Sequence, residues 1–235
     1  MVRSDRAVTL TKLALEMKTA HDTEPTADTV IHQALELIDE ANWVSLTVRA
    51  ARRGFVTLAS TGPESQRADE LQYALREGPC VTAASEGEWY RSGSVGDDPR
   101  WPRWGPRAAG LGIESLLSIQ LSTDDATLGA LNIYSSRRDA FGDRDDVDFA
   151  VLYGAHAAVA LTSAREISGL HSALQSRHSI GLAQGMLIER YGLTVEASFS
   201  LLRRYSSDLN LKLADVAADI VRTGQLPPDP DGPME

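Results

Sequence analysis

One thiol and five imidazoles are the groups in this sequence best suited to nucleophilic chemistry. Cys80 is the only cysteine, and a catalytic thiolate there would need a histidine base close by. All the histidines are distant from it in sequence (His21, His32, His156, His171 and His178). No glycine-rich loop ends in Gly-Lys-Ser/Thr, and neither HExxH nor CxxC spacing occurs. We therefore expect no enzyme active site and no metal centre, and we interpret Cys80 as a small core or pocket residue.

Two tryptophans, Trp101 and Trp104, stand among prolines and arginines in an irregular stretch. Such rings could close over a small ligand against a sheet, with Cys80 in the same pocket. The alternative is that they only cover the core. A run of aspartates between Asp143 and Asp148 resembles a metal site, but at a helix start these carboxylates point to several faces. We interpret them as a solvated first turn that complements the helix dipole.

Glycine and basic residues mark the C-terminal part. Gly181 and Gly185 fall inside a helical pattern, where each costs about 1 kcal/mol relative to alanine. That cost indicates close approach, either by a neighbouring helix or by a nucleic-acid backbone. Around one later turn the sequence gathers donors suited to phosphates and bases, with Tyr205 available for stacking. These donors are Arg203, Arg204, Ser206, Asn210 and Lys212. A solvated corner is the alternative.

Hydrophobic periodicity predicts the elements that position these residues. Helices are expected over 4–19 and after an N-cap at Thr26, and a further helix begins at Asp143. Alternation predicts two strand pairs, and Gly78–Gly112 is interpreted as a long crossing segment with a short helix near its end. The expected strands are Val44–Val48, Phe55–Ala59, Leu116–Leu121 and Leu128–Tyr134. The fold class is therefore α+β, an antiparallel sheet flanked by helices.

The remainder of the chain is expected to be a three-helix unit. Its helices are predicted over Leu170–Tyr191, over Val195–Ser206 with Thr194 as N-cap, and after an N-cap at Asn210. Helical character is nearly continuous from Asp143, with a break near Ser168-Gly169. Apolar residues left over on this connection favour a homodimer. Packing of its first half on its own sheet is an equally good interpretation.

Composition bounds the function classes. The chain has 235 residues and a formal net charge of −10, with an ordinary globular share of hydrophobic residues. Residues 170–226 carry six basic and five acidic side chains, hence +1, so the rest carries −11. That contrast permits nucleic-acid contact only in the C-terminal part. No apolar stretch suits a signal peptide or membrane span, so we expect a cytoplasmic protein with no membrane contact.

The C-terminal residues in their order resemble an ANTAR domain, the three-helix RNA-binding module of bacterial transcription antiterminators. The matching positions are Arg177, Ile180, Ala183, Gly185, Leu187-Ile188-Glu189-Arg190, Phe199, Leu202, Ser206, Asn210, Lys212-Leu213 and Val216-Ala217. Gln184 stands where this family often has lysine, and Ser198 where alanine is usual. The resemblance implies an RNA face formed by Ala183, Gln184, Gly185, Arg203, Arg204, Asn210 and Lys212.

The upstream part resembles a GAF domain of the type fused to ANTAR domains in actinobacterial regulators. Four runs carry this resemblance: Glu77–Cys80, Asp98–Pro102, Gly129–Ser135 and Ala155–Leu161. The resemblance implies a sensor domain over residues 1–166, with the pocket candidates Cys80, Trp101 and Trp104. The ANTAR domain would span 167–227, and residues 228–235 would form a disordered tail.

Together these resemblances imply a transcription regulator. Its sensor, with no resident cofactor but with a small-molecule signal of unknown identity, would control an ANTAR module that binds stem-loops in nascent leader RNA. Bivalent contact by a dimer with tandem hairpins would multiply weak single-site binding. The alternative is a signalling sensor acting through protein–protein contact, with the three-helix unit as a dimerisation or docking element.

Overall fold

A computed structural model describes residues 22–50, 54–86, 89–123 and 126–226. The helix expected over 4–19, residues 51–53 between the first two expected strands, and the tail expected from 228 fall outside the described residues. The chain divides into two compact units, which we call the N-terminal unit (up to Ser168) and the C-terminal unit (from Gly169). Each is described by itself below.

The N-terminal unit is built on a five-stranded antiparallel sheet with strand order β2-β1-β5-β4-β3. Its strands are β1 (Trp43–Ala50), β2 (Gly54–Ser60), β3 (Trp89–Ser92), β4 (Ser115–Ser122) and β5 (Thr127–Ser135). The two predicted strand pairs are the antiparallel pairs β1–β2 and β4–β5, and β1 and β5 join them. The α+β prediction is confirmed.

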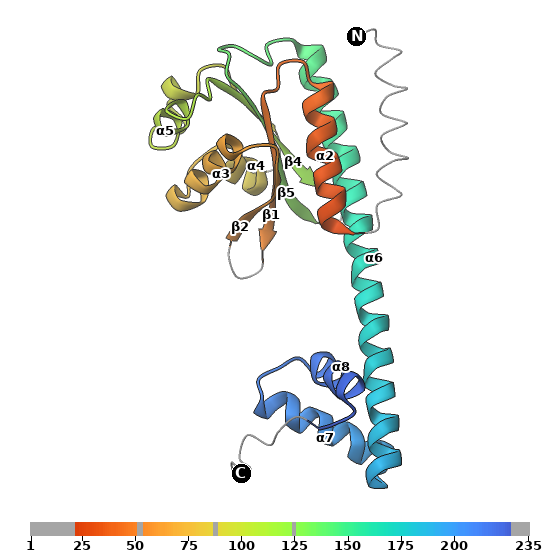
Figure 1. The fold of residues 1–235 in the computed structure, drawn as a ribbon. Helices are drawn as coiled ribbons and strands as arrows, with labels where there is room; N and C mark the ends of the chain where they lie inside the picture. Colours follow the sequence, from red (N-terminus) through yellow and green to blue (C-terminus); the bar gives the residue numbers. More distant parts are fainter. Residues whose placement is uncertain (1–21, 51–53, 87–88, 124–125, 227–235) are drawn as a thin grey trace. The chain divides into compact units, whose positions relative to one another are not determined.

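Helix α2 (Thr23–Leu37) and the first part of α6 (Arg144–Tyr191) cover one face of this sheet (Figure 1). Apolar side chains from α2, α6 and alternate strand positions form the main core there, among them Ile31, Leu46 and Tyr153. The Tyr153 hydroxyl donates a 2.7 Å hydrogen bond to the Val30 carbonyl and so joins the two helices. The expected start of α2 was wrong, because Thr26 lies inside the helix and Asp22 is its N-cap.

Helices α3 (Pro63–Leu75), α4 (Pro79–Glu86) and α5 (Gly105–Ala109) lie on the opposite face (Figure 1). The short helix expected near the end of the irregular segment is confirmed as α5. That segment also contains α4, the edge strand β3 and a 3-10 turn at Val95–Asp97. The prediction of a crossing segment without further regular structure was therefore wrong. Helix α3 has no counterpart in the predicted elements.

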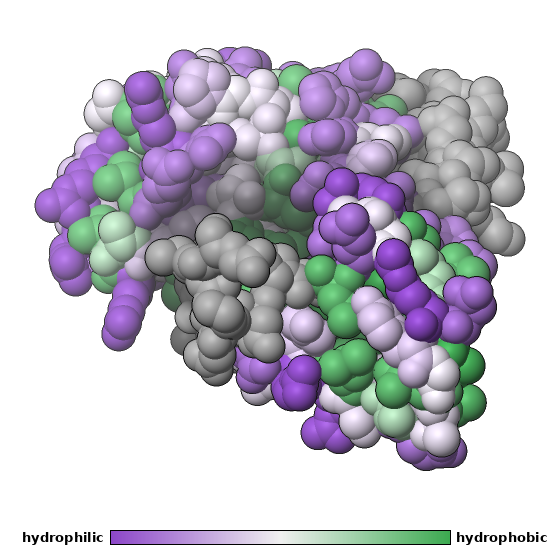
Figure 2. All heavy atoms as spheres, turned by 60° about the horizontal axis from the view of Figure 1, so that its bottom comes forward, coloured by the Kyte–Doolittle hydropathy of each residue, from purple (hydrophilic) through white to green (hydrophobic). Residues whose placement is uncertain are grey.

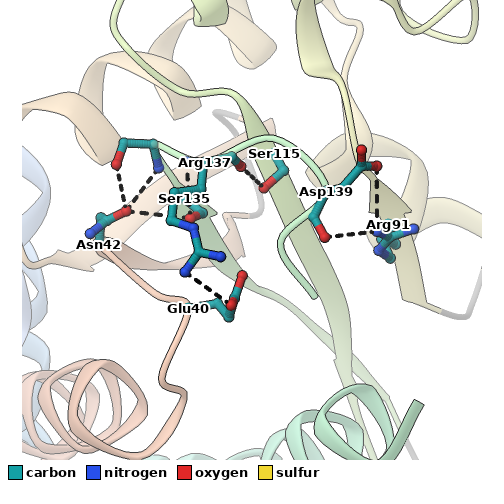
Figure 3. Close-up of polar contacts among 8 residues, drawn as sticks. Glu40, Asn42, Arg91, Ser115, Ser135, Arg137 and Asp139 are labelled. Carbon is teal, nitrogen blue, oxygen red and sulfur yellow. Dashed lines mark hydrogen bonds and ion pairs between the residues drawn. The ribbon is translucent and has the colours of Figure 1, made fainter. Parts of the chain in front are cut away.

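The loop between β5 and α6 is fixed by polar contacts (Figure 3). The Asn42 side-chain oxygen accepts hydrogen bonds from the Ser136 backbone N–H at 2.8 Å and from the Ser135 hydroxyl at 3.3 Å. Arg137 forms an ion pair with Glu40 at 3.2 Å. Because these partners lie between α2 and β1, the beginning of the β5–α6 loop is anchored to the segment that precedes β1.

Helix α6 runs without interruption for 48 residues, so the predicted break near Ser168-Gly169 was wrong. Gly169 is exposed and remains helical. Among the described residues, α6 is also the one helix long and apolar enough over 18 residues to cross a membrane, contrary to the expectation that no segment reaches that length. Half of that window is buried inside the structure. Buried core helices pass the same test, so it assigns no membrane span.

The C-terminal unit consists of the end of α6, α7 (Val195–Asp208) and α8 (Leu213–Thr223) around a small apolar core. Thr194 caps α7 as predicted, since its hydroxyl accepts a 3.1 Å hydrogen bond from the Ala197 N–H. Gly224 ends α8 in the left-handed conformation. The expected cap at Asn210 was wrong: Lys212 is the N-cap of α8, and Asn210 has a φ of 51° in the preceding turn.

Candidate functional site

A buried carboxylate, Asp69, is the centre of a polar cluster between α3 and the sheet. Its Oδ1 accepts hydrogen bonds from the Tyr134 hydroxyl at 2.6 Å and from the Asn132 amide at 3.1 Å. Its Oδ2 accepts one from the Thr57 hydroxyl at 3.0 Å. Thr47 lies opposite at 3.5 Å. Four elements therefore meet at one side chain: α3, β1, β2 and β5.

The strands place these donors by simple alternation. Along β1, Val44 and Leu46 face the apolar core, so Ser45 and Thr47 face α3 and α4 instead. On β5, Asn132 and Tyr134 are two residues apart and share that same face. The Ser118 hydroxyl of β4 completes the row by donating a 2.7 Å hydrogen bond to the side-chain oxygen Oδ1 of Asn132. This face of the sheet is thus polar although it is fully buried.

The hydroxyl groups form a directed chain. Tyr73 Oη lies 2.7 Å from Thr47 Oγ1 and 2.9 Å from Thr57 Oγ1. Because Thr57 gives its only hydroxyl proton to Asp69, it must accept from Tyr73. Thr47 has one hydroxyl proton as well, which it can give to Tyr73 at 2.7 Å or to Asp69 at 3.5 Å. Asp69 is consequently the terminal acceptor of a chain that leads through α3 and back to β1.

Electrostatics make Asp69 unusual. Burial raises the pKa of its carboxyl to about 6, although hydrogen bonds from Tyr134, Ser45, Thr57 and Asn132 oppose this rise. Within the described part of the chain, no ion pair involves Asp69. Burial, and then the nearby Asp69 charge, raise the pKa of the Tyr134 and Tyr73 hydroxyls as well. A buried charge balanced by hydrogen bonds alone is a centre whose proton or ligand occupancy can change.

The three predicted pocket residues all lie on the α3/α4 side of the sheet, in two separate buried clusters. Trp104 is fully buried and its indole N–H donates a 2.9 Å hydrogen bond to the Ala68 carbonyl. Trp101 packs edge-on against it, with ring centroids 6.2 Å apart. Cys80 is buried in a separate small cluster that Tyr90 connects to Trp101. Burial raises the pKa of its thiol to about 12, which opposes nucleophilic use.

In the C-terminal unit the predicted basic residues surround the end of α7 and the turn into α8. Arg203, Arg204, Asn210 and Lys212 are all exposed. The turn has a defined shape, because the Ser206 hydroxyl donates a 2.7 Å hydrogen bond to the Leu211 carbonyl. The structure therefore presents three cations and one amide around one rigid corner.

The predicted residues on α6 have different surroundings. Ala183 is fully buried in the core of the unit, whereas Gly185 is exposed. Gln184 is half-buried, and its amide donates to the Val195 carbonyl at 3.2 Å and to the Ser198 hydroxyl at 3.3 Å. Gln184 thus attaches the first turn of α7 to α6, a structural use of the side chain that differs from the family's usual lysine.

Tyr205 was expected to be available for stacking, and this was wrong. It is only 7% exposed and packs in the core of the C-terminal unit, with the Arg204 guanidinium 5.7 Å from its ring centroid. Figure 2 shows one face of the molecule, on which hydrophobic side chains lie among polar ones. The exposed large hydrophobic residues of α7 are Val195 and Phe199.

No pattern in the predicted elements pointed to Asp69 or to most of its partners as functional residues. Asp69 sits on a helix without an apolar stripe, so no hydrophobic pattern indicated that it is buried. A usable signal was present on the strands, where the polar residues Ser45 and Thr47 on β1 and Asn132 and Tyr134 on β5 recur at spacing two. If the sheet face that carries these residues is taken to be buried and not solvated, their spacing indicates an internal polar layer.

Comparisons with known proteins match both units. A family model described as GAF domain matches residues 20–162, and one described as ANTAR domain matches residues 168–221. No curated protein sequence matches the chain.

Several solved structures share the N-terminal fold. The GAF domain of a phosphoenolpyruvate-protein phosphotransferase from Coxiella burnetii has 19% identity and a TM-score of 0.55, covering 70% of this chain and 96% of that chain. The corresponding Acinetobacter domain has 15% identity and a TM-score of 0.54, covering 72% and 99%. Free methionine-R-sulfoxide reductase from Neisseria meningitidis, solved with its substrate, has 16% identity and a TM-score of 0.53, covering 67% and 88%. At these identities the likeness is one of fold.

Proposed function

The chain belongs to the GAF domain family and couples a GAF sensor domain to an ANTAR RNA-binding antitermination domain, and from this premise we propose how it works. It is a cytoplasmic, non-enzymatic regulator of the type found in actinobacteria. Its ANTAR domain binds stem-loops in nascent leader RNA and prevents a terminator from forming. We place the sensor domain at 1–166, the ANTAR domain at 167–227 and a tail at 228–235.

The exposed basic corner of the C-terminal unit is the observation that carries this proposal. Arg203, Arg204 and Lys212 lie around a turn with Asn210, in a protein that is otherwise acidic. Phosphate contact requires such exposed cations, and RNA loops additionally offer base edges to an amide. The other predicted residues lie on α6: Gln184 contacts the first turn of α7, Gly185 is exposed next to it, and Ala183 packs in the core of the unit.

The signal enters through the sensor domain. The Asp69 cluster connects α3 with three strands, including β5, which leads directly into the loop before α6. A small polar molecule or a proton that changes this cluster has a covalent route to α6 through Tyr134 and β5. Control requires that the signal binds two states of the sensor with different affinity.

A homodimer completes the proposal. Helix α6 leaves a row of large hydrophobic side chains exposed: Leu152 at 54%, Val159 at 59%, Leu170 at 66% and Leu174 at 62%. Pairing of this helix with a second copy would remove the row from water, and it would present two ANTAR domains to tandem hairpins.

The test is a titration of the full chain with a tandem stem-loop RNA transcribed from the leader of its own operon, at several salt concentrations, with duplex DNA as control. Salt-sensitive binding to the hairpins alone supports the proposal. If neither the full chain nor a folded 170–226 fragment binds, the proposal fails. The second candidate, a sensor that acts through protein contact, then takes its place; the exposed hydrophobic row of α6 favours it.

A further inference from the structure

Phe199 is the exposed aromatic ring of α7. The C-terminal unit has three aromatic residues, Tyr191, Phe199 and Tyr205, and Tyr205 is buried in its core. Phe199 is 38% exposed, whereas Ser198 and Leu202 on the neighbouring stripe of α7 are fully buried. Covering the exposed part of the ring by a binding partner would remove apolar surface from water and would be favourable.

The position of Phe199 on the surface is well defined. Gln184 attaches the backbone and the Ser198 hydroxyl of this first turn to α6, and Thr194 caps it. Val195, one turn before Phe199, is 60% exposed. Arg203, one turn after it, is also exposed. An apolar ring followed by a guanidinium at i+4 therefore lies on a helix edge that is held rigid before any ligand arrives.

The glycines of α6 point to an external partner near this turn. A Cβ added at Gly181 or Gly185 would meet no atom within 4 Å, so no neighbouring helix among the described residues requires either glycine. Their combined cost of about 2 kcal/mol in helix propensity is thus not offset by packing inside the chain. They flank Gln184, which touches the start of α7, and they leave the α6 backbone open beside that contact.

We propose that Phe199 is a stacking platform for an unpaired base of the RNA loop, and that Arg203 holds a phosphate next to that base. This inference rests on the proposed RNA-binding function and names the subsite that reads the loop. Sequence-specific RNA recognition uses bases that are splayed out and stacked on aromatic rings. Glu196 lies on the other side of Phe199, so the phosphate is held at the Arg203 end, where no acidic side chain follows until Asp208.

The alternative occupant is a protein. Stable protein interfaces bury about 800 Å² per partner around an apolar centre. The edge of α7 offers only Phe199 and Val195 before the charged residues Glu196 and Arg203 begin. That size fits one base and its phosphate better than a protein partner.

The test uses the full chain and the tandem stem-loop RNA with 2-aminopurine in place of one loop base at a time. Stacking quenches this fluorophore, and a purely structural role of Phe199 would not. We expect Phe199→Leu to weaken binding about tenfold and to abolish the quench. Phe199→Tyr keeps a ring and should retain both. The matched control is Tyr191→Leu, which removes the other exposed ring of the unit and should change neither.

The outcomes are distinct. Because Phe199 carries no charge, Phe199→Leu should leave the salt dependence of binding unchanged. If the wild-type chain does not bind the RNA, the proposed function and this inference both fail. If the wild type binds while Phe199→Leu matches it in affinity and quench, this inference alone is overturned. Loss of self-association in Phe199→Leu with RNA binding intact would also overturn it and would assign the ring to a protein interface. Far-UV circular dichroism of each variant checks folding.

Discussion

Replacing Asp69 by asparagine tests whether the sensor domain contains a buried charge that opposes folding. The carboxyl has a pKa raised from 3.8 to about 6. A group with a raised folded-state pKa contributes stability that is fully present below the unfolded pKa and is lost as pH rises through the folded one. Two pKa units correspond to about 3 kcal/mol. The free energy of unfolding should therefore fall by about 2 kcal/mol between pH 4 and pH 6.5 through this residue alone, which is most of the full amount.

Asparagine has nearly the same shape and cannot ionise. Its side-chain oxygen can still accept the hydrogen bonds that Tyr134 and Asn132 donate to Oδ1 of Asp69. Its amide would then face the Thr57 and Thr47 hydroxyls, which can rotate and accept. The variant should thus keep the network and lose the pH dependence. Asp69→Ala would instead leave the donors unsatisfied and should destabilise the domain at every pH.

The assay is urea denaturation of the full chain at pH 4 to 8, followed by tryptophan fluorescence. All four tryptophans (Trp43, Trp89, Trp101 and Trp104) lie in the N-terminal unit, so the signal reports on that unit alone. The difference between wild type and Asp69→Asn cancels the other titrating groups. If the two stability profiles run parallel from pH 4 to 6.5, the carboxyl does not titrate in this range and the reasoning is refuted.

Three further predictions concern single residues. Lys212→Ala should weaken RNA binding and reduce the salt slope by roughly one unit, and an unchanged slope in the same titration would remove Lys212 from the phosphate contacts. Gly185→Ala should raise the free energy of unfolding of the C-terminal unit by about 1 kcal/mol, since no described atom opposes a Cβ there, and circular dichroism measures this effect. The same variant should weaken RNA binding in the titration, and tighter RNA binding would contradict a close approach of RNA to the α6 backbone. Cys80, buried with its pKa raised to about 12, should resist iodoacetamide at pH 8 in the native chain and react only in urea, and rapid native labelling seen by mass spectrometry would show that α4 does not protect it.

Sequence periodicity could predict every element with an apolar stripe or strict alternation. It located four of the five strands, α6, α7 and α8, and the cap at Thr194, because these elements bury hydrophobic residues at regular spacing. It missed α3 because the residues that α3 buries are Ser65, Ala68, Asp69 and Gln72, which give no such stripe. It missed β3 because this short edge strand lies among prolines and glycines that also favour loops.

The two candidate sites differ in how far the sequence could predict them. The basic corner depends on residues that are close in the chain, and the ANTAR resemblance identified them directly. The Asp69 cluster depends on α3 meeting β1, β2 and β5, with hydrogen-bonded partners up to 87 residues apart. The pKa of Asp69 is raised because the carboxyl is buried, and its burial results from tertiary packing. For the same reason Tyr205 was misjudged and Phe199 was not distinguished from the core residues of α7.

The composition of α3 sets how the sensor domain opens. Three of its four fully buried residues are polar, so its separation from the sheet would exchange internal hydrogen bonds for bonds to water and would also uncover the apolar cluster around Trp104. Such a sub-global opening has a free energy below that of global unfolding. Amide hydrogens of α3 should accordingly exchange before those of α2, which is held by Val30 and Ile31 in the apolar core. An opening of α3 would give a small hydrophilic molecule access to the polar cluster around Asp69.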